Sequence, residues 1–251
     1  MTDDAFGDDD ARRYDLLNPW GPSDDFYLGL VRSARAVLDI GCGTGTLLHR
    51  ARERGHTGRL CGLDPSAAML GRARRRTDIE WIPGDASCLD TDAGHGAAFD
   101  LVVMTGHAFQ CLTTDAALRG TLTAVRTALA DGGRFAFETR NPLVRPWERW
   151  TPDRATEVTD AGITARIAHR VELPVRGDLV RFSETCSLPD GDRVRWSSLR
   201  FWDAASLTGW LRAAGLTVEE QYGDWDRSPL TDRSPEIITL AGVAARSRCG
   251  D

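Results

Sequence analysis

Residues 37–45 read VLDIGCGTG, a short apolar run followed by one acid and by glycines at every second position. An apolar run of this length next to glycines is typical of a buried strand that turns into a helix. Glycine lets the backbone of such a turn come close to a ligand and leaves the first amides of the helix free to bind it. The stretch therefore predicts a ligand site at the end of a strand, with Asp39 beside it.

The rest of the chain alternates short apolar runs with helical patterns. We expect strands at 36–40, 59–64, 79–82, 99–104 and 133–139. The expected helices are 23–35, Thr46 to Arg54, Pro65 to Arg76, and Thr113 or Thr114 to Ala130. Strands that are apolar at nearly every position indicate a parallel sheet covered on both faces, as in a Rossmann-like core.

The pattern changes after Pro142. Residues 154–202 show period-two runs separated by turn residues, which indicates an antiparallel insertion rather than another βα unit. A helix at 203–215 and two closing strands at 216–222 and 236–243 follow. We divide the chain into an acidic tail with a covering segment (1–22), a core (23–141 and 203–251) and the insertion (142–202), which would form a lid.

Composition narrows the classes of partner. The chain has 251 residues, a net charge of -6 and a pI near 5.4, so nucleic acid and anionic membranes are unfavourable partners. No apolar stretch approaches the roughly 20 residues of a membrane helix. The six cysteines are scattered and do not cluster with histidine, which favours neither a metal site nor disulfides and fits reduced thiols in the cytoplasm. All 31 basic residues are arginine, so no lysine can act as a base.

Acidic residues follow three consecutive expected strands. Asp39 ends the first, Asp64 the second and Asp85 the third. An acid in the position of Asp64 can accept hydrogen bonds from ribose hydroxyls, and Asp85 could accept one from an adenine amino group. Each acid alone could equally be a loop or cap residue. Together they favour a ligand with few negative charges, and a pyrophosphate would be repelled by Asp39. An NAD-type oxidoreductase is therefore disfavoured, since its loop should read GxGxxG without the preceding acid.

Five segments in order, VLDIGCGTG, GLDPSAAML, PGDA, FDLVVMTGHAFQ and LADGGRFAFE, resemble the successive motifs of class I S-adenosylmethionine-dependent methyltransferases. The resemblance covers about residues 36–140. It implies S-adenosylmethionine as the cofactor and S-adenosylhomocysteine as the product. It also implies a seven-stranded sheet of order 3-2-1-4-5-7-6, because the family closes its sheet with an antiparallel hairpin.

The resemblance assigns cofactor contacts by position. Asp39 and the Gly41–Gly45 loop would hold the methionine part, Asp64 the ribose, and Met69 with Asp85 the adenine. An N-terminal segment that closes over the cofactor would contribute Tyr14, although Tyr14 could instead pack on the sheet. The full expected set is Tyr14, Trp20, Asp39, Gly41, Cys42, Gly43, Gly45, Asp64, Pro65, Met69, Gly84, Asp85, Ala86, Thr105 and Gly106.

His107 is the candidate base. Methyl transfer is an in-line displacement that depends largely on positioning, and a base is needed only if the acceptor arrives protonated. Histidine titrates near neutral pH and can take a proton from an amine, phenol or enol. A histidine after the fourth strand also occurs in the sugar N,N-dimethyltransferases of antibiotic pathways, which this stretch resembles. The alternative is a capping or packing role.

The acceptor is expected to be a small molecule. The fourth strand lacks the [Asn/Asp]-Pro-Pro-aromatic sequence of methylation on nucleic-acid amino groups, and no Pro-Cys nucleophile exists. Aromatic and arginine side chains near the cofactor suit a flat or partly anionic acceptor, although the same pattern would build a hydrophobic roof. The candidates are Phe109, Asn141, Arg145, Trp147, Trp150, Arg200 and Trp202. We expect N- or O-methylation in specialised metabolism by a monomer or homodimer; the alternative is a cofactor-binding scaffold or regulator without transfer activity.

Overall fold

The computed structural model describes residues 7–89 and 94–243. The first six residues of the expected acidic tail and the end of the expected core (244–251), with Cys249, lie outside the described residues. Within the described part, no helix is both long enough and apolar enough to cross a membrane.

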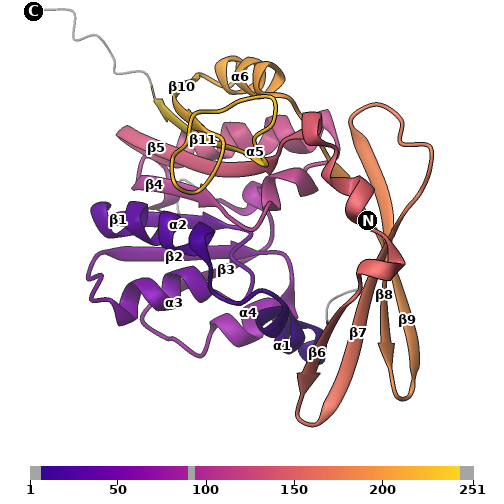
Figure 1. The fold of residues 1–251 in the computed structure, drawn as a ribbon. Coiled ribbons are helices and arrows are strands. Elements are labelled where there is room, and N and C mark those ends of the chain that lie inside the picture. Colours follow the sequence, from indigo (N-terminus) through magenta and orange to yellow (C-terminus); the bar gives the residue numbers. More distant parts are fainter. Residues whose placement is uncertain (1–6, 90–93, 244–251) are drawn as a thin grey trace, which may run out of the picture.

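A mixed sheet forms the centre of the molecule (Figure 1). Its parallel strands are β1 (Ala36–Ile40), β2 (Arg59–Asp64), β3 (Glu80–Pro83), β4 (Phe99–Met104) and β5 (Leu129–Arg140). The antiparallel pair is β10 (Leu216–Tyr222) and β11 (Glu236–Val243), with β11 next to β5. The order β10-β11-β5-β4-β1-β2-β3 confirms the predicted order 3-2-1-4-5-7-6.

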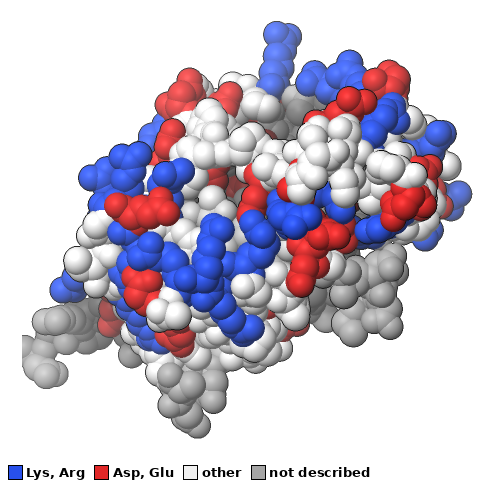
Figure 2. All heavy atoms as spheres, turned by 90° about the horizontal axis from the view of Figure 1, so that it is seen from below, with Lys and Arg blue, Asp and Glu red and all other residues white. Residues whose placement is uncertain are grey.

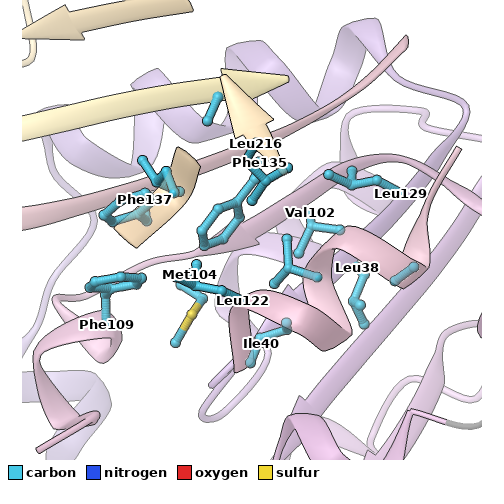
Figure 3. Close-up of a cluster of buried hydrophobic side chains, with 14 of the residues drawn as sticks. Leu38, Ile40, Val102, Met104, Phe109, Leu122, Leu129, Phe135, Phe137 and Leu216 are labelled. Atoms are coloured by element: carbon cyan, nitrogen blue, oxygen red, sulfur yellow. The ribbon is translucent and has the colours of Figure 1, made fainter. Parts of the chain in front are cut away.

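Helices pack on both faces of this sheet. Alternate strand residues point to opposite faces, so Val37 packs with one helix layer and Leu38 with the other. The layer on the Val37 face contains α2 (Pro22–Ser33) and α3 (Thr46–Glu53). The layer on the Leu38 face contains α5 (Asp115–Ala128) and α6 (Ala204–Ala213). Figure 3 shows the buried cluster on the Leu38 face, where Phe135 and Phe137 of β5 lie among aliphatic side chains.

The insertion forms a second sheet. Its antiparallel strands are β6 (Thr156–Asp160), β7 (Ile163–Val171), β8 (Leu179–Leu188) and β9 (Gly191–Arg200). Short 3-10 turns, η4 (Pro142–Val144), η5 (Pro146–Arg149) and η6 (Pro152–Arg154), lead into it from β5. Figure 1 shows this sheet standing beside the central one, as expected for an antiparallel insertion.

The structure corrects one local prediction and gives detail to another. The helix after β2, α4 (Ala67–Ala73), begins after Pro65 because Ser66 caps it by accepting a hydrogen bond from the Met69 amide. Residues 8–17, which we placed in the acidic tail and covering segment, form helix α1 (Asp8–Leu17). This helix contacts α4 and β6, and its Arg12 pairs with Asp160 of β6.

Candidate functional site

The main cavity lies at the carboxyl ends of β1, β4 and β5 and has a volume of about 450 Å³. Helices α1 and α2 and the 105–107 turn complete its wall. In a sheet of this topology, the carboxyl ends of the strands beside the first crossover are where ligands bind. The expected site residues that line it are Tyr14, Trp20, Asp39, Gly41, Cys42, Gly43, Thr105, Gly106 and His107.

The glycines of the loop after β1 serve different purposes. All three have a positive φ, at 76° for Gly41, 56° for Gly43 and 78° for Gly45. Residues other than glycine rarely adopt such a backbone angle. A Cβ on Gly45 would lie 2.5 Å from the Trp81 ring, so this glycine makes room for the protein's own packing. A Cβ on Gly43 would meet nothing within 4 Å, and Gly43 lines the cavity. Backbone thus faces the cavity at Gly43.

Asp39 provides a buried carboxylate at the same place. Its residue is 1% exposed, and its Oδ1 has no hydrogen-bond partner within the described part of the chain. Burial, with the nearby carboxylates of Asp64 and Glu138, raises the pKa of Asp39 to about 8. A buried acid that lacks a partner and repels its neighbours is suited to a cationic ligand. We call Asp39, Gly41 and Gly43 the glycine-loop end of the main cavity.

Asp64 is next to the loop but is already bonded to backbone. Its carboxylate accepts hydrogen bonds from the amides of Gly43 and Ser66, both at 2.8 Å. Burial raises the pKa of Asp64, while these two hydrogen bonds oppose the rise. Asp85 instead caps the 3-10 turn η1 (Ala86–Cys88) by accepting from the Ser87 amide. The remaining expected contacts that do not line the main cavity are Gly45, Pro65, Met69, Gly84 and Ala86.

Helix α1 covers the glycine-loop end. Asp15 accepts a hydrogen bond from the Thr44 hydroxyl in the loop and pairs with Arg72 of α4 at 3.0 Å, which fixes the helix over the site. Tyr14, in the same turn of the helix, directs its hydroxyl toward Gly106, where a Cβ would lie 3.6 Å from that oxygen. Burial and the Asp64 carboxylate raise the pKa of Tyr14. Trp20 donates to Asp25 at 2.8 Å and receives the Arg50 guanidinium over its ring.

The histidine end of the main cavity consists of His107, Glu138 and Glu236. His107 Nε2 lies 3.0 Å from a carboxylate oxygen of Glu236, at the start of β11. Its backbone amide donates to Glu138 Oε1 at 2.7 Å, and the Tyr27 hydroxyl donates to the other oxygen of Glu138. His107 itself has a positive φ of 61°, and these contacts hold the turn in place. Burial raises the pKa of Glu138.

Sequence reasoning missed Glu138, Glu236, Tyr27 and Arg140, all of which line the main cavity. One signal was available for Glu138: it is a charged residue inside the otherwise apolar run FAFE. A buried acid in such a run needs a specific partner. Glu236 and Arg140 gave no comparable signal, because they meet only when β11 pairs with β5 in the register Glu236↔Arg140.

Several predicted acceptor residues lie elsewhere. Phe109 is 1% exposed and stacks on Phe137, with ring centroids 4.1 Å apart, so it belongs to the buried cluster of Figure 3. Trp202 is 3% exposed and packs edge-on against Phe109. Asn141 is 1% exposed, and its amide donates to the carbonyls of Thr231 and Ser234. Phe109 and Trp202 pack in the core, and Asn141 holds the 231–234 segment. None of the three lines the main cavity, which corrects their assignment to acceptor binding.

The other predicted acceptor residues are outside the main cavity too. Arg200 pairs with Asp115 of α5 and Asp178 before β8, so it ties the insertion to the core. Arg145, Trp147 and Trp150 line a separate cavity of about 570 Å³, the tryptophan cavity, between η5 and β7. We expected these three residues near the cofactor, but none of them lines the main cavity with His107.

One group of side chains in the described residues has metal-ligand character. Atoms of Cys61, Glu80 and His95 lie within 4.8 Å of one another. Glu80 is paired with Arg59 at 2.8 Å, and a guanidinium at that carboxylate opposes a metal cation. Cys61 and Glu80 face each other near the amino ends of β2 and β3, away from the main cavity.

Comparison with known proteins shows which families this chain is similar to. Residues 37–133 match the model of a methyltransferase domain. The dTDP-4-amino-2,3,4,6-tetradeoxy-D-glucose N,N-dimethyltransferase of Saccharopolyspora spinosa is 28% identical over 240 residues, covering 87% of this chain and 89% of the relative. The matched domain and these relatives support S-adenosylmethionine-dependent methyltransferase activity for this chain, as the resemblance to class I enzymes implies.

Other similar proteins have names that state different acceptors, or none. The cypemycin N-terminal methyltransferase of a Streptomyces species is 27% identical over 215 residues, covering 82% of each chain. The structure of the CcbJ methyltransferase from Streptomyces caelestis has a TM-score of 0.76 at 19% identity, covering 97% of this chain and 100% of the other. CalS10, an amino pentose methyltransferase of Micromonospora echinaspora solved with S-adenosylmethionine bound, has a TM-score of 0.66 at 24% identity, covering 96% and 99%.

The residues of the methyltransferase fit the cofactor chemically. S-adenosylmethionine carries two positive groups, a sulfonium and an ammonium, and one negative carboxylate. Its amino-acid part is therefore suited to a site with buried acids and with backbone that no side chain covers. The unpartnered Oδ1 of Asp39 and the open backbone at Gly43 provide both. Helix α1 covers this end of the main cavity, and His107 lines the same cavity.

Proposed function

We propose that this methyltransferase methylates a nitrogen or oxygen atom of a small molecule by in-line displacement, with His107 as the base. The bound cofactor supplies an activated methyl group. The observation that carries the proposal is that His107 and the unpartnered Asp39 line one cavity, so that the base and the expected cofactor position share one chamber.

The contact with Glu236 gives His107 a defined tautomer. A carboxylate accepts hydrogen bonds, so Nε2 carries the hydrogen and Nδ1 is the nitrogen left to take a proton. By accepting this hydrogen bond, Glu236 holds the imidazole ring in one orientation, as an acid does for the base of a catalytic triad. Glu236 therefore acts as a positioning residue. An ammonium or phenol acceptor would lose its proton to His107.

Other features support a small-molecule acceptor rather than a nucleic acid. Arginine side chains gather near the middle of the face in Figure 2, with acidic side chains beside them. Several arginines of α3 and α4 are ion-paired, among them Arg50 with Glu53 and Arg72 with Asp15. Paired arginines have little excess charge for phosphate backbones. We further propose a cytoplasmic enzyme of specialised metabolism, a monomer or homodimer.

The test combines binding and turnover. Calorimetry should detect heat with S-adenosylmethionine and with S-adenosylhomocysteine, and release of the latter should depend on one class in a panel of amines, phenols and carboxylates. Cofactor binding without release on any acceptor would favour a scaffold or regulator instead. Absence of heat with both cofactor forms, together with tight NADH binding, would overturn the proposal.

A further inference from the structure

A second cavity adjoins the histidine end and is lined by three arginines. This arginine cavity has a volume of about 250 Å³, and its lining includes Arg140, Arg149, Arg233 and Glu236. Arg140 and Glu236 also line the main cavity, so the two cavities share a wall formed by neighbouring strand ends. A group bound in the arginine cavity would lie one side chain away from the Glu236–His107 pair.

The lining of this cavity carries more positive than negative charge. Arg149 and Arg233 make no ion pair with any described residue, although nearby Arg145 pairs with Glu148 at 3.0 Å. Arg140 donates to the Gln110 side chain at 3.1 Å and lies over the Trp150 ring, with no carboxylate within ion-pair distance among the described residues. Burial lowers the pKa of Arg140, and the carboxylates of Glu236 and Glu138 oppose that change. The single acid, Glu236, is bonded to His107.

An exposed arginine ordinarily needs no partner, because water solvates it. Here the three arginines come from β5, from η5 and from the segment before β11, and all three line one cavity, although Arg149 and Arg233 are also exposed to solvent. The Asn141 amide group holds the last of these segments by donating to the carbonyls of Thr231 and Ser234, on both sides of Arg233. The buried Asn141 therefore fixes the wall of the arginine cavity rather than touching an acceptor.

We propose that the acceptor carries an anionic group, a phosphate ester or a carboxylate, which binds Arg140, Arg149 and Arg233 while its nucleophile lies at His107. This inference rests on the proposed function. Guanidinium groups bind both anions through charge-assisted hydrogen bonds. The arginine cavity is smaller than the roughly 300–1,000 Å³ of a whole small-molecule site, so it suits a substituent of the acceptor.

The binding test uses inorganic pyrophosphate and succinate as separate probes, titrated by calorimetry into the full chain with S-adenosylhomocysteine present. We expect one of the anions to bind, and the double variant Arg149→Ala/Arg233→Ala to weaken that binding at least about tenfold. The control Arg32→Ala/Arg154→Ala removes the same charge from exposed positions and should leave the binding unchanged within about twofold. No heat from either anion, or equal weakening in both double variants, would overturn the inference.

The activity test compares acceptors that differ only in the anionic group, such as an amino sugar and its 1-phosphate, or an amine with and without a carboxylate. We expect at least about tenfold higher kcat/KM for the anionic member, and loss of that preference in Arg149→Ala/Arg233→Ala. A neutral member that reacts as well would overturn the inference while leaving the methyltransferase function intact. Failure of the proposed function would appear separately, as absent heat with the cofactor.

Discussion

The two ends of the main cavity are built in different ways. At the glycine-loop end, Asp39, Gly41 and Gly43 come from one strand and the turn that follows it. At the histidine end, His107 and Glu236 are 129 residues apart in the sequence, and Tyr27 reaches Glu138 across 111 residues. The first end is a local device that depends on backbone shape, whereas the second depends on the pairing of β11 with β5.

The two ends also differ in whether their polar groups have hydrogen-bond partners in the protein. Asp39 is an acid without a hydrogen-bond partner for its Oδ1 among the described residues, while each residue of the histidine end is bonded to another. A buried acid without a partner is suited to bind a cationic ligand. A network of hydrogen bonds, in contrast, holds a base in one orientation. We therefore expect substitutions at the glycine-loop end to change cofactor affinity, and substitutions at the histidine end to change turnover.

The largest effect is expected at the histidine end. His107→Ala should lower kcat by about 10²–10⁴-fold, the usual contribution of general acid–base catalysis, with little change in cofactor Kd. His107→Asn is the matched variant, because asparagine tolerates the positive φ of this position and has no basic nitrogen. Steady-state kinetics with the acceptor and calorimetry with the cofactor separate the two quantities. Unchanged turnover in both variants would remove the role of base.

At the glycine-loop end, Asp39→Asn should weaken S-adenosylmethionine binding with a smaller effect on kcat. A hydrogen bond to a charged group is worth about 1.5–3 kcal/mol, which corresponds to roughly tenfold to hundredfold in Kd. Glu138→Gln, a change of a buried acid at the other end, should affect cofactor affinity less. Calorimetry checks both variants, and equal Kd values for Asp39→Asn and the unaltered enzyme would contradict the division between the ends.

The same division explains how much the sequence could predict. The glycine-loop end and the sheet order follow from contiguous motifs, in which each strand and its turn lie together in the chain. Aromatic side chains such as Phe109 and Trp202 were misplaced because a hydrophobic pattern does not distinguish the core from a binding wall. The contact between Glu236 and His107 could not be predicted. It depends on the register in which β11 pairs with β5, and the sequence does not show that register.

A pH-dependent effect should follow from the raised pKa of Asp39. The folded protein holds this proton up to about pH 8, whereas the unfolded chain releases it near pH 4. The free energy of unfolding of the cofactor-free protein should therefore fall as the pH rises between these values, by up to about 1.4 kcal/mol per pH unit. Asp39→Asn should reduce this slope. Urea unfolding at several pH values measures it, and identical slopes for both proteins would show that Asp39 ionises normally.

The smallest effect is expected from Tyr14→Phe, which distinguishes a cofactor contact of the Tyr14 side chain from a packing role. If the Tyr14 hydroxyl binds the cofactor, its removal should cost about 0.5–1.5 kcal/mol, or a twofold to tenfold rise in cofactor Kd. If Tyr14 only packs over Gly106, phenylalanine preserves that packing and Kd should not change. Tyr14→Ala removes both contributions and should weaken binding further. Because Asp15 still fixes α1 through Thr44 and Arg72 in either variant, a change in Kd would report on the side chain rather than on loss of the helix.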